Sequence, residues 1–128
     1  MSLMNIGIPD QDGIISYYGS DAQSMIHMEE CAELIQAISK VRRTVHRLGV
    51  PLDPCRSEDE ATAYNHLVEE ISDVLICMEQ MTEMYGIKNT EIQDMVAMKC
   101  ARQEKRMEKE AREKVLGITG FSGIGGVQ

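Results

Sequence analysis

Four acidic residues occupy positions on two predicted helices where buried apolar side chains are expected. Glu30 and Glu33 fall within the apolar stripe of one helix, and Glu70 and Asp73 fall within that of another. Residues three or four apart share one face of a helix, so each pair is expected among buried side chains. A lone carboxylate is too costly to bury without a partner or a metal ion. The two pairs therefore predict that cations are held between two facing helices.

The helical period extends over three long segments, about 20–48, 58–85 and 89–115. Ser57, with Glu60 three residues on, forms a capping box at the start of the second. Three long helices with short connections predict an all-α helical bundle. Helices of this length leave apolar surface uncovered, so we expect homo-oligomerisation, as a homodimer or homotetramer, to complete the bundle.

The predicted organisation has three parts. Residues 1–19 form an N-terminal segment without a clear period, for which a short turn or a frayed segment is expected. Residues 20–115 form the all-α domain. Residues 116–128 form a Gly-rich tail that buries too little to order itself, so it is expected to be flexible.

The composition of the chain limits the classes of molecule that it is expected to bind. The chain has 21 acidic and 13 basic residues and a formal net charge of −8, which argues against nucleic-acid binding. No apolar run is long enough to span a membrane, and no signal peptide is recognisable. The expected setting is therefore the cytoplasm, without a membrane as partner.

The two carboxylate pairs suit a hard divalent cation. Mg²⁺ prefers oxygen ligands and usually takes some of them from substrate phosphates. The third predicted helix supplies opposite charge, because Lys99 and Arg102 share one face of it. These two residues are candidates for binding phosphate, although a solvated basic face is the simpler explanation of the same pattern.

These motifs together resemble a known family. Glu30-x-x-Glu33, the string E-E-I-S-D-V-L that contains Glu70 and Asp73, and the string K-C-A-R-Q-E-K-R at 99–106 are similar to motifs of the MazG-like all-α nucleoside triphosphate pyrophosphatases. The likeness covers about residues 20–106. A single E-x-x-E is common in helices, whereas two such pairs followed by a basic helix are far more specific.

The resemblance implies a Mg²⁺-dependent hydrolase that converts a nucleoside triphosphate, often a deoxynucleotide, to the monophosphate and pyrophosphate, with Mn²⁺ as a substitute metal. It assigns Glu30, Glu33, Glu70 and Asp73 as catalytic metal ligands. It also assigns Lys99 and Arg102 to the substrate phosphates. The Asn that the family carries just before the Lys is absent, and Ala97 stands two residues before Lys99. Base and sugar specificity stay open.

Two other interpretations fit parts of the pattern. In a non-catalytic helical assembly or binding module of the same fold, the carboxylates would pair with Lys40, Arg42 or Arg43 across a subunit interface. A di-iron or di-manganese carboxylate bundle would require Glu-x-x-His pairs, and the sequence contains none. The position of both acidic pairs among core residues favours the hydrolase.

Overall fold

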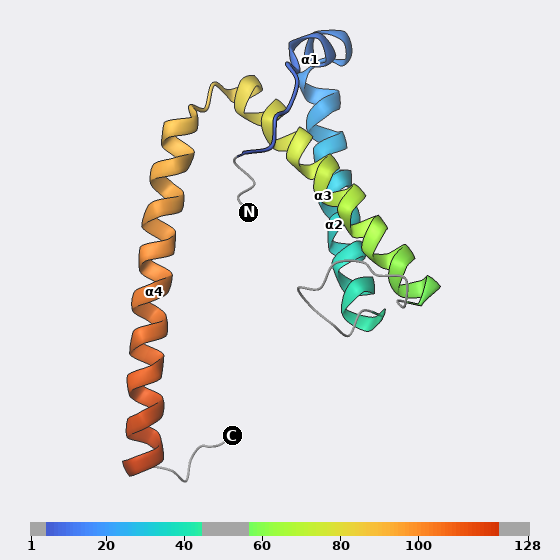
Figure 1. The fold of residues 1–128 in the computed structure, drawn as a ribbon. Coiled ribbons are helices and arrows are strands. Elements are labelled where there is room, and N and C mark those ends of the chain that lie inside the picture. Colours follow the sequence, from blue (N-terminus) through green and yellow to red (C-terminus); the bar gives the residue numbers. More distant parts are fainter. Residues whose placement is uncertain (1–4, 45–56, 121–128) are drawn as a thin grey trace. The chain divides into compact units, whose positions relative to one another are not determined.

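The computed structural model describes residues 5–44 and 57–120, and the regular elements in these ranges are α-helices. The helices in Figure 1 are α1 (Asp12–Tyr18), α2 (Ser20–Thr44), α3 (Glu58–Tyr85) and α4 (Asn89–Gly120). No strand occurs in this described part of the chain, so the predicted all-α class is confirmed. The chain consists of two units, Met1–Ile87 with α1 to α3, and Lys88–Gln128 with α4.

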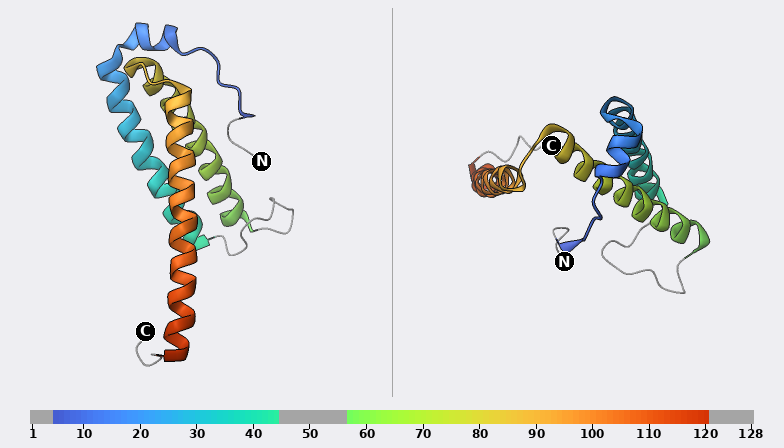
Figure 2. Two further views of the ribbon diagram at one scale, coloured as in Figure 1. Left: turned by 90° about the vertical axis from the view of Figure 1, so that its left-hand side faces the viewer. Right: turned by 90° about the horizontal axis from the view of Figure 1, so that it is seen from above.

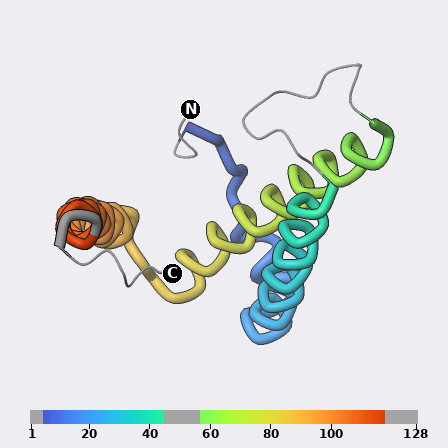
Figure 3. Tube along the Cα trace, turned by 90° about the horizontal axis from the view of Figure 1, so that it is seen from below, coloured from blue at the N-terminus to red at the C-terminus, as the bar shows by residue number. Residues whose placement is uncertain are grey.

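In the first unit, α2 and α3 lie side by side and run in opposite directions, as the ribbons in Figures 1 and 2 and the tube in Figure 3 show. The apolar side chains buried in the described ranges are small, namely Ala37, Ala63, Val74 and Cys77. Small side chains at the contact let two helix axes approach closely. The interface therefore contains little apolar volume, and polar side chains complete it.

A buried hydrogen-bond network centres on Gln80 of α3. Its Oε1 accepts a hydrogen bond from Nε2 of Gln23 at 2.9 Å and lies 2.8 Å from Nε2 of His27. Because an amide oxygen only accepts, Nε2 of His27 carries the hydrogen. Nε2 of Gln80 donates to Oε1 of Gln11 at 2.9 Å, and Gln11 donates in turn to the carbonyl oxygen of Pro9. The network fastens the segment before α1 to both long helices.

The ends of α3 follow the local signals in the sequence. Oγ of Ser57 accepts a hydrogen bond from the backbone N–H of Glu60 and donates to the Glu60 carboxylate, both at 3.2 Å, so the predicted N-cap at Ser57 is confirmed. Gly86 ends the helix in the left-handed conformation, with φ of 64°. The backbone N–H of Ile87 then donates to the carbonyl oxygen of Thr82, a pattern that satisfies the last carbonyls of a helix.

Helix α1 corrects the prediction of a turn or frayed segment before residue 20. Its seven residues make only two turns, which is too short for an apolar period to be read from the sequence. The Asp10 carboxylate accepts a hydrogen bond from the backbone N–H of Asp12 at the start of the helix. Gln11 is held by Gln80, so tertiary contacts stabilise a helix that its own sequence only weakly indicates.

In its described residues, the second unit is a single long helix. Helix α4 begins at Asn89, as predicted, and continues to Gly120, five residues beyond the predicted end at Val115. Its side chains from Asn89 to Leu116 are exposed. The predicted end of the first long helix, at residue 48, and the tail from residue 121 lie outside the described residues. Within the described ranges, no helix combines the length and the apolar character needed to cross a membrane.

The contact between α1 and α3 is expected to depend on pH. A hydrogen bond to Asp12, partial desolvation and the charges of Asp12 and Asp10 raise the pKa of Glu83 to about 7, from an ordinary value of 4.5. Because the folded-state pKa is the higher one, the contribution of this contact to stability is present below about pH 4.5 and is lost as pH rises through about 7. Hydrogen exchange of α1 amides, corrected for intrinsic rates, should therefore accelerate from about pH 5 to about pH 8.

Glu83→Gln provides the comparison for this effect. Its amide donates to Asp12 at every pH, so the protection of α1 should become independent of pH across the same range. Amides in the middle of α3 serve as the internal reference. Equal protection of the α1 amides at about pH 5 and at about pH 8 in the unmodified protein would contradict a hydrogen bond from protonated Glu83 to Asp12.

Candidate metal centre

Three carboxylates converge between α2 and α3. One oxygen each of Glu30, Glu70 and Asp73 lie within 4.8 Å of one another. Glu70 is only 2% exposed and is the largest fully buried side chain in the described ranges, while Glu30 and Asp73 are half-buried. The cluster therefore lies inside the helix interface and not on an open acidic surface.

Two of the buried carboxylate oxygens have no hydrogen-bond partner among the described residues. These are Oε2 of Glu30 and Oε2 of Glu70. Buried polar atoms in native proteins are nearly always hydrogen-bonded, and an exception needs an explanation such as a bound ion. Unpartnered oxygens on two facing helices, with a third carboxylate beside them, fit the oxygen-rich coordination that Mg²⁺ or Mn²⁺ prefers.

The raised pKa values in the cluster also favour the binding of a cation there. Burial raises the pKa of Glu70, and the charges of Glu33 and Asp73 raise it further, while His66 acts in the opposite direction. Burial likewise raises the pKa of Glu30, followed by the charges of Asp73, Glu33 and Glu70. Carboxylates that share a site repel one another when ionised. A cation bound between them removes this repulsion.

Glu33, the fourth predicted ligand, occupies the edge of the cluster. It is exposed, and it is not among the carboxylates that converge within 4.8 Å. Three residues correspond to 300° of helical rotation, so Glu33 is turned 60° from Glu30 around α2, away from the direction in which the buried Gln23 and His27 lie. Its charge nevertheless raises the pKa of both Glu30 and Glu70. The structure therefore brings three of the four predicted carboxylates together and leaves the fourth facing solvent.

The predicted phosphate-binding residues lie on α4, in the second unit. Lys99 and Arg102 are both exposed and three residues apart, so they share a face of that helix. Their assignment to substrate phosphates stays a prediction.

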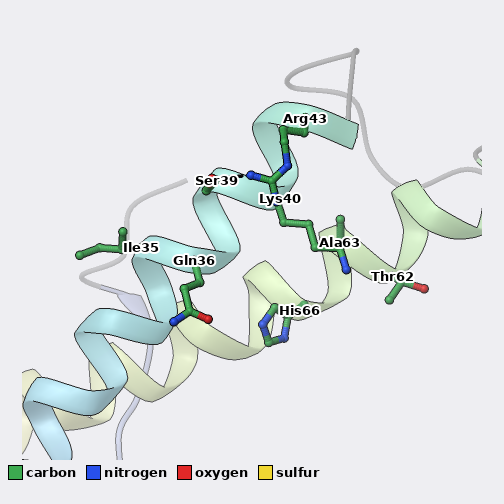
Figure 4. A pocket seen from close by; sticks show the side chains of 8 residues that line it. All are labelled: Ile35, Gln36, Ser39, Lys40, Arg43, Thr62, Ala63 and His66. Carbon is green, nitrogen blue, oxygen red and sulfur yellow. Dashed lines mark hydrogen bonds between the residues drawn. The ribbon is translucent and has the colours of Figure 1, made fainter.

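A pocket of about 680 Å³ on the first unit was not anticipated from the sequence. Figure 4 shows its lining residues, with Lys40 extended from α2 towards α3. They are Ile35, Gln36, Ser39, Lys40, Arg43, Thr62, Ala63 and His66. The sequence signal that could have located it is spacing, because Lys40 follows Glu33 by two helical turns on the same face.

His66 joins this pocket to the carboxylates. It precedes Glu70 by one turn of α3, and its Nδ1 lies 3.7 Å from Oε1 of Glu70. The side chain is 46% exposed, so the imidazole reaches from the buried cluster to the open pocket. His27, in contrast, is buried in the network around Gln80 and serves packing.

The first unit thus contains an acidic cluster between two helices, an imidazole at the edge of the cluster and a cationic pocket beyond it. Comparison of the chain with protein-family models, with curated proteins and with solved structures found no match to any of them.

Proposed function

We propose that this protein is a Mg²⁺-dependent nucleoside triphosphate pyrophosphohydrolase, with Mn²⁺ as a substitute metal. The observation that carries the proposal is the convergence of Glu30, Glu70 and Asp73 within 4.8 Å, with two buried oxygens unpartnered. An acidic chain that binds a polyphosphate requires cations at the binding site. The cluster supplies their ligands, and the paired motifs that carry it are those that resemble MazG-like enzymes.

The chemistry follows from this ligand set. Glu30, Glu70 and Asp73 would hold the metal, and Glu33 would complete the set from the solvent side. When bound, Mg²⁺ neutralises the charge that develops on the phosphoryl oxygens. In the reaction, water oxygen bonds to the α-phosphorus and the bond from that phosphorus to the bridging oxygen breaks. The products are the nucleoside monophosphate, pyrophosphate and one proton.

Product analysis tests this assignment. The protein would be incubated with ribo- and deoxynucleoside triphosphates of each base, with Mg²⁺ and again with EDTA in excess. We expect monophosphate and pyrophosphate in equal amounts, only with Mg²⁺, and the ranking of substrates will define base and sugar specificity. Formation of the nucleoside diphosphate and orthophosphate would contradict the proposed bond cleavage. No product from any nucleotide would favour the non-catalytic assembly module.

We also propose that the protein works as a homo-oligomer. Met25, Met28 and Ala32 follow one another on α2 at spacings of three and four residues, and all three are exposed. They lie on a different face from the buried side chains of this helix. Together with the small apolar core, an exposed stripe of this kind indicates a subunit interface. It is also the observation that favours an assembly module as the second candidate function.

Met28→Glu is expected to shift the protein to a smaller assembly, because a charge placed on the stripe must be desolvated when subunits associate. Light scattering after size-exclusion chromatography measures the mass of the assembly. Asn65→Glu, on an exposed polar position of α3, is the matched control and should leave the mass unchanged. A monomeric wild-type protein, or an unchanged Met28→Glu assembly, would exclude the stripe as the interface.

A further inference from the structure

The pocket beside the carboxylates presents cations that have no acidic partner among the described residues. Lys40 and Arg43 both line it, and within the described part of the chain neither forms an ion pair. Nη1 of Arg43 donates to Oγ of Ser39 at 2.7 Å, which orients the guanidinium and leaves its other donors available. In a chain with a net charge of −8, a concave surface with two unpaired cations is the kind of site that attracts an anion.

The pocket adjoins the carboxylate cluster at His66. On α2, Lys40 lies ten residues, or about 15 Å along the helix axis, beyond Glu30 of the cluster. On α3, His66 lines the pocket and lies one turn from Glu70. His66 is therefore the side chain at which the pocket and the carboxylate cluster meet.

The lining favours phosphate over a nucleobase. Among the eight lining residues there is no Phe, Tyr or Trp on which a base would stack, whereas Gln36, Ser39 and Thr62 add hydrogen-bonding groups to the two cations. The volume of about 680 Å³ lies within the range of small-ligand sites, so a pyrophosphate group fits with its hydrating waters. Guanidinium and ammonium groups form charge-assisted hydrogen bonds with phosphate oxygens.

We propose that this pocket binds the pyrophosphate end of the substrate, with Lys40 and Arg43 contacting the β- and γ-phosphates. The inference rests on the proposed function and concerns cations of α2 alone, separately from the residues of α4 that the sequence predicts for phosphate. When the bond from the α-phosphorus to the bridging oxygen breaks, its electron pair remains on the pyrophosphate. The two cations stabilise that negative charge on the leaving group.

Binding of inorganic pyrophosphate in the presence of Mg²⁺, measured by titration calorimetry, tests the pocket directly. Lys40→Gln and Arg43→Gln should each weaken pyrophosphate binding about 10-fold or more, the expected loss for a hydrogen bond to a charged group. Arg42→Gln is the matched control, since Arg42 is the adjacent exposed cation on α2 and does not line the pocket. It should bind within about two-fold of the unmodified protein.

Two further measurements separate this inference from the proposed function. Mn²⁺ binding without nucleotide, followed by electron paramagnetic resonance, should be lost in Glu70→Gln and retained in Lys40→Gln and Arg43→Gln. Two results would overturn the pocket and leave the metal site supported, provided that Mn²⁺ binding is retained. One is an equal pyrophosphate affinity in all α2 variants, and the other is no pyrophosphate binding by the unmodified protein. Absent Mn²⁺ binding in the unmodified protein overturns both. A changed oligomer mass in Lys40→Gln would assign the cations to a subunit interface and overturn the inference.

Discussion

Glu70→Gln is expected to lower the rate of pyrophosphate release at least about 100-fold at saturating Mg²⁺. Replacing a residue that merely supports a metal ligand commonly costs 10- to 100-fold in affinity or activity, and Glu70 is proposed as a ligand itself. It is the most buried of the converging carboxylates, and its Oε2 has no hydrogen-bond partner in the described ranges. The amide keeps the size of the side chain and removes the charge that a divalent cation requires.

Initial rates of pyrophosphate release measure this effect. Glu79→Gln is the matched control, because it makes the same change on α3 nine residues away and outside the cluster. Its rate should remain within about two-fold of the unmodified enzyme. A Glu70→Gln protein of normal activity would show that the buried carboxylate does not take part in the reaction.

The thermal stability of Glu70→Gln distinguishes the proposed hydrolase from the non-catalytic assembly module. The folded-state pKa of Glu70 is raised, so the ionised carboxylate destabilises the metal-free protein as pH rises through that value. Without metal at about pH 8, Glu70→Gln should therefore have a higher melting temperature than the unmodified protein. Mg²⁺ should stabilise only the protein that retains Glu70. A strongly destabilised variant would instead indicate that the carboxylate pairs with a cation across a subunit interface.

Gln80→Ala is expected to lower the free energy of unfolding by about 3 kcal/mol. The substitution leaves three buried side chains, Gln11, Gln23 and His27, without the partner that each has now. A buried polar group left unsatisfied costs about 1–3 kcal/mol. The three penalties are not additive, because the affected groups belong to one network and relax together.

Chemical denaturation at one protein concentration and in the absence of metal measures this loss. Asn65→Ala, an exposed position on the same helix, is the matched control and should change stability by no more than about 0.5 kcal/mol. A cost below about 1 kcal/mol for Gln80→Ala would mean that water replaces the amide in the network. Release of α1 should accompany the loss, since Gln80 holds Gln11 at its start.

Much of the fold follows from signals that act over one or two helical turns. The N-cap at Ser57 and the stop at Gly86 are local hydrogen-bonding and backbone effects, so the sequence predicts both ends of α3 correctly. The placement of Glu70 in a buried stripe follows from the helical period of α3 alone. A helix of seven residues has too few turns for the same reasoning, and α1 was missed for that reason.

The candidate site shows where local reasoning ends. Spacing alone places four carboxylates on two helical faces, and it predicts all four equally as metal ligands. Which of them converge depends on the rotation and the axial offset of α2 against α3, and these bring Glu30, Glu70 and Asp73 together while Glu33 faces solvent. The pocket at Lys40 and the network around Gln80 depend on the same two quantities.

The difference between what the sequence predicts and what only the packing determines has one physical cause. Helix propensity, capping and amphipathic period are properties of neighbouring residues, so they can be read along the chain, and they determined the all-α class, both ends of α3 and the two acidic pairs. Packing of one helix against another depends on the shapes of both surfaces, and here Ala37 and Ala63 allow the close approach. Only that packing decided that a buried histidine pairs with a glutamine, and that a cationic pocket adjoins the carboxylate cluster at His66.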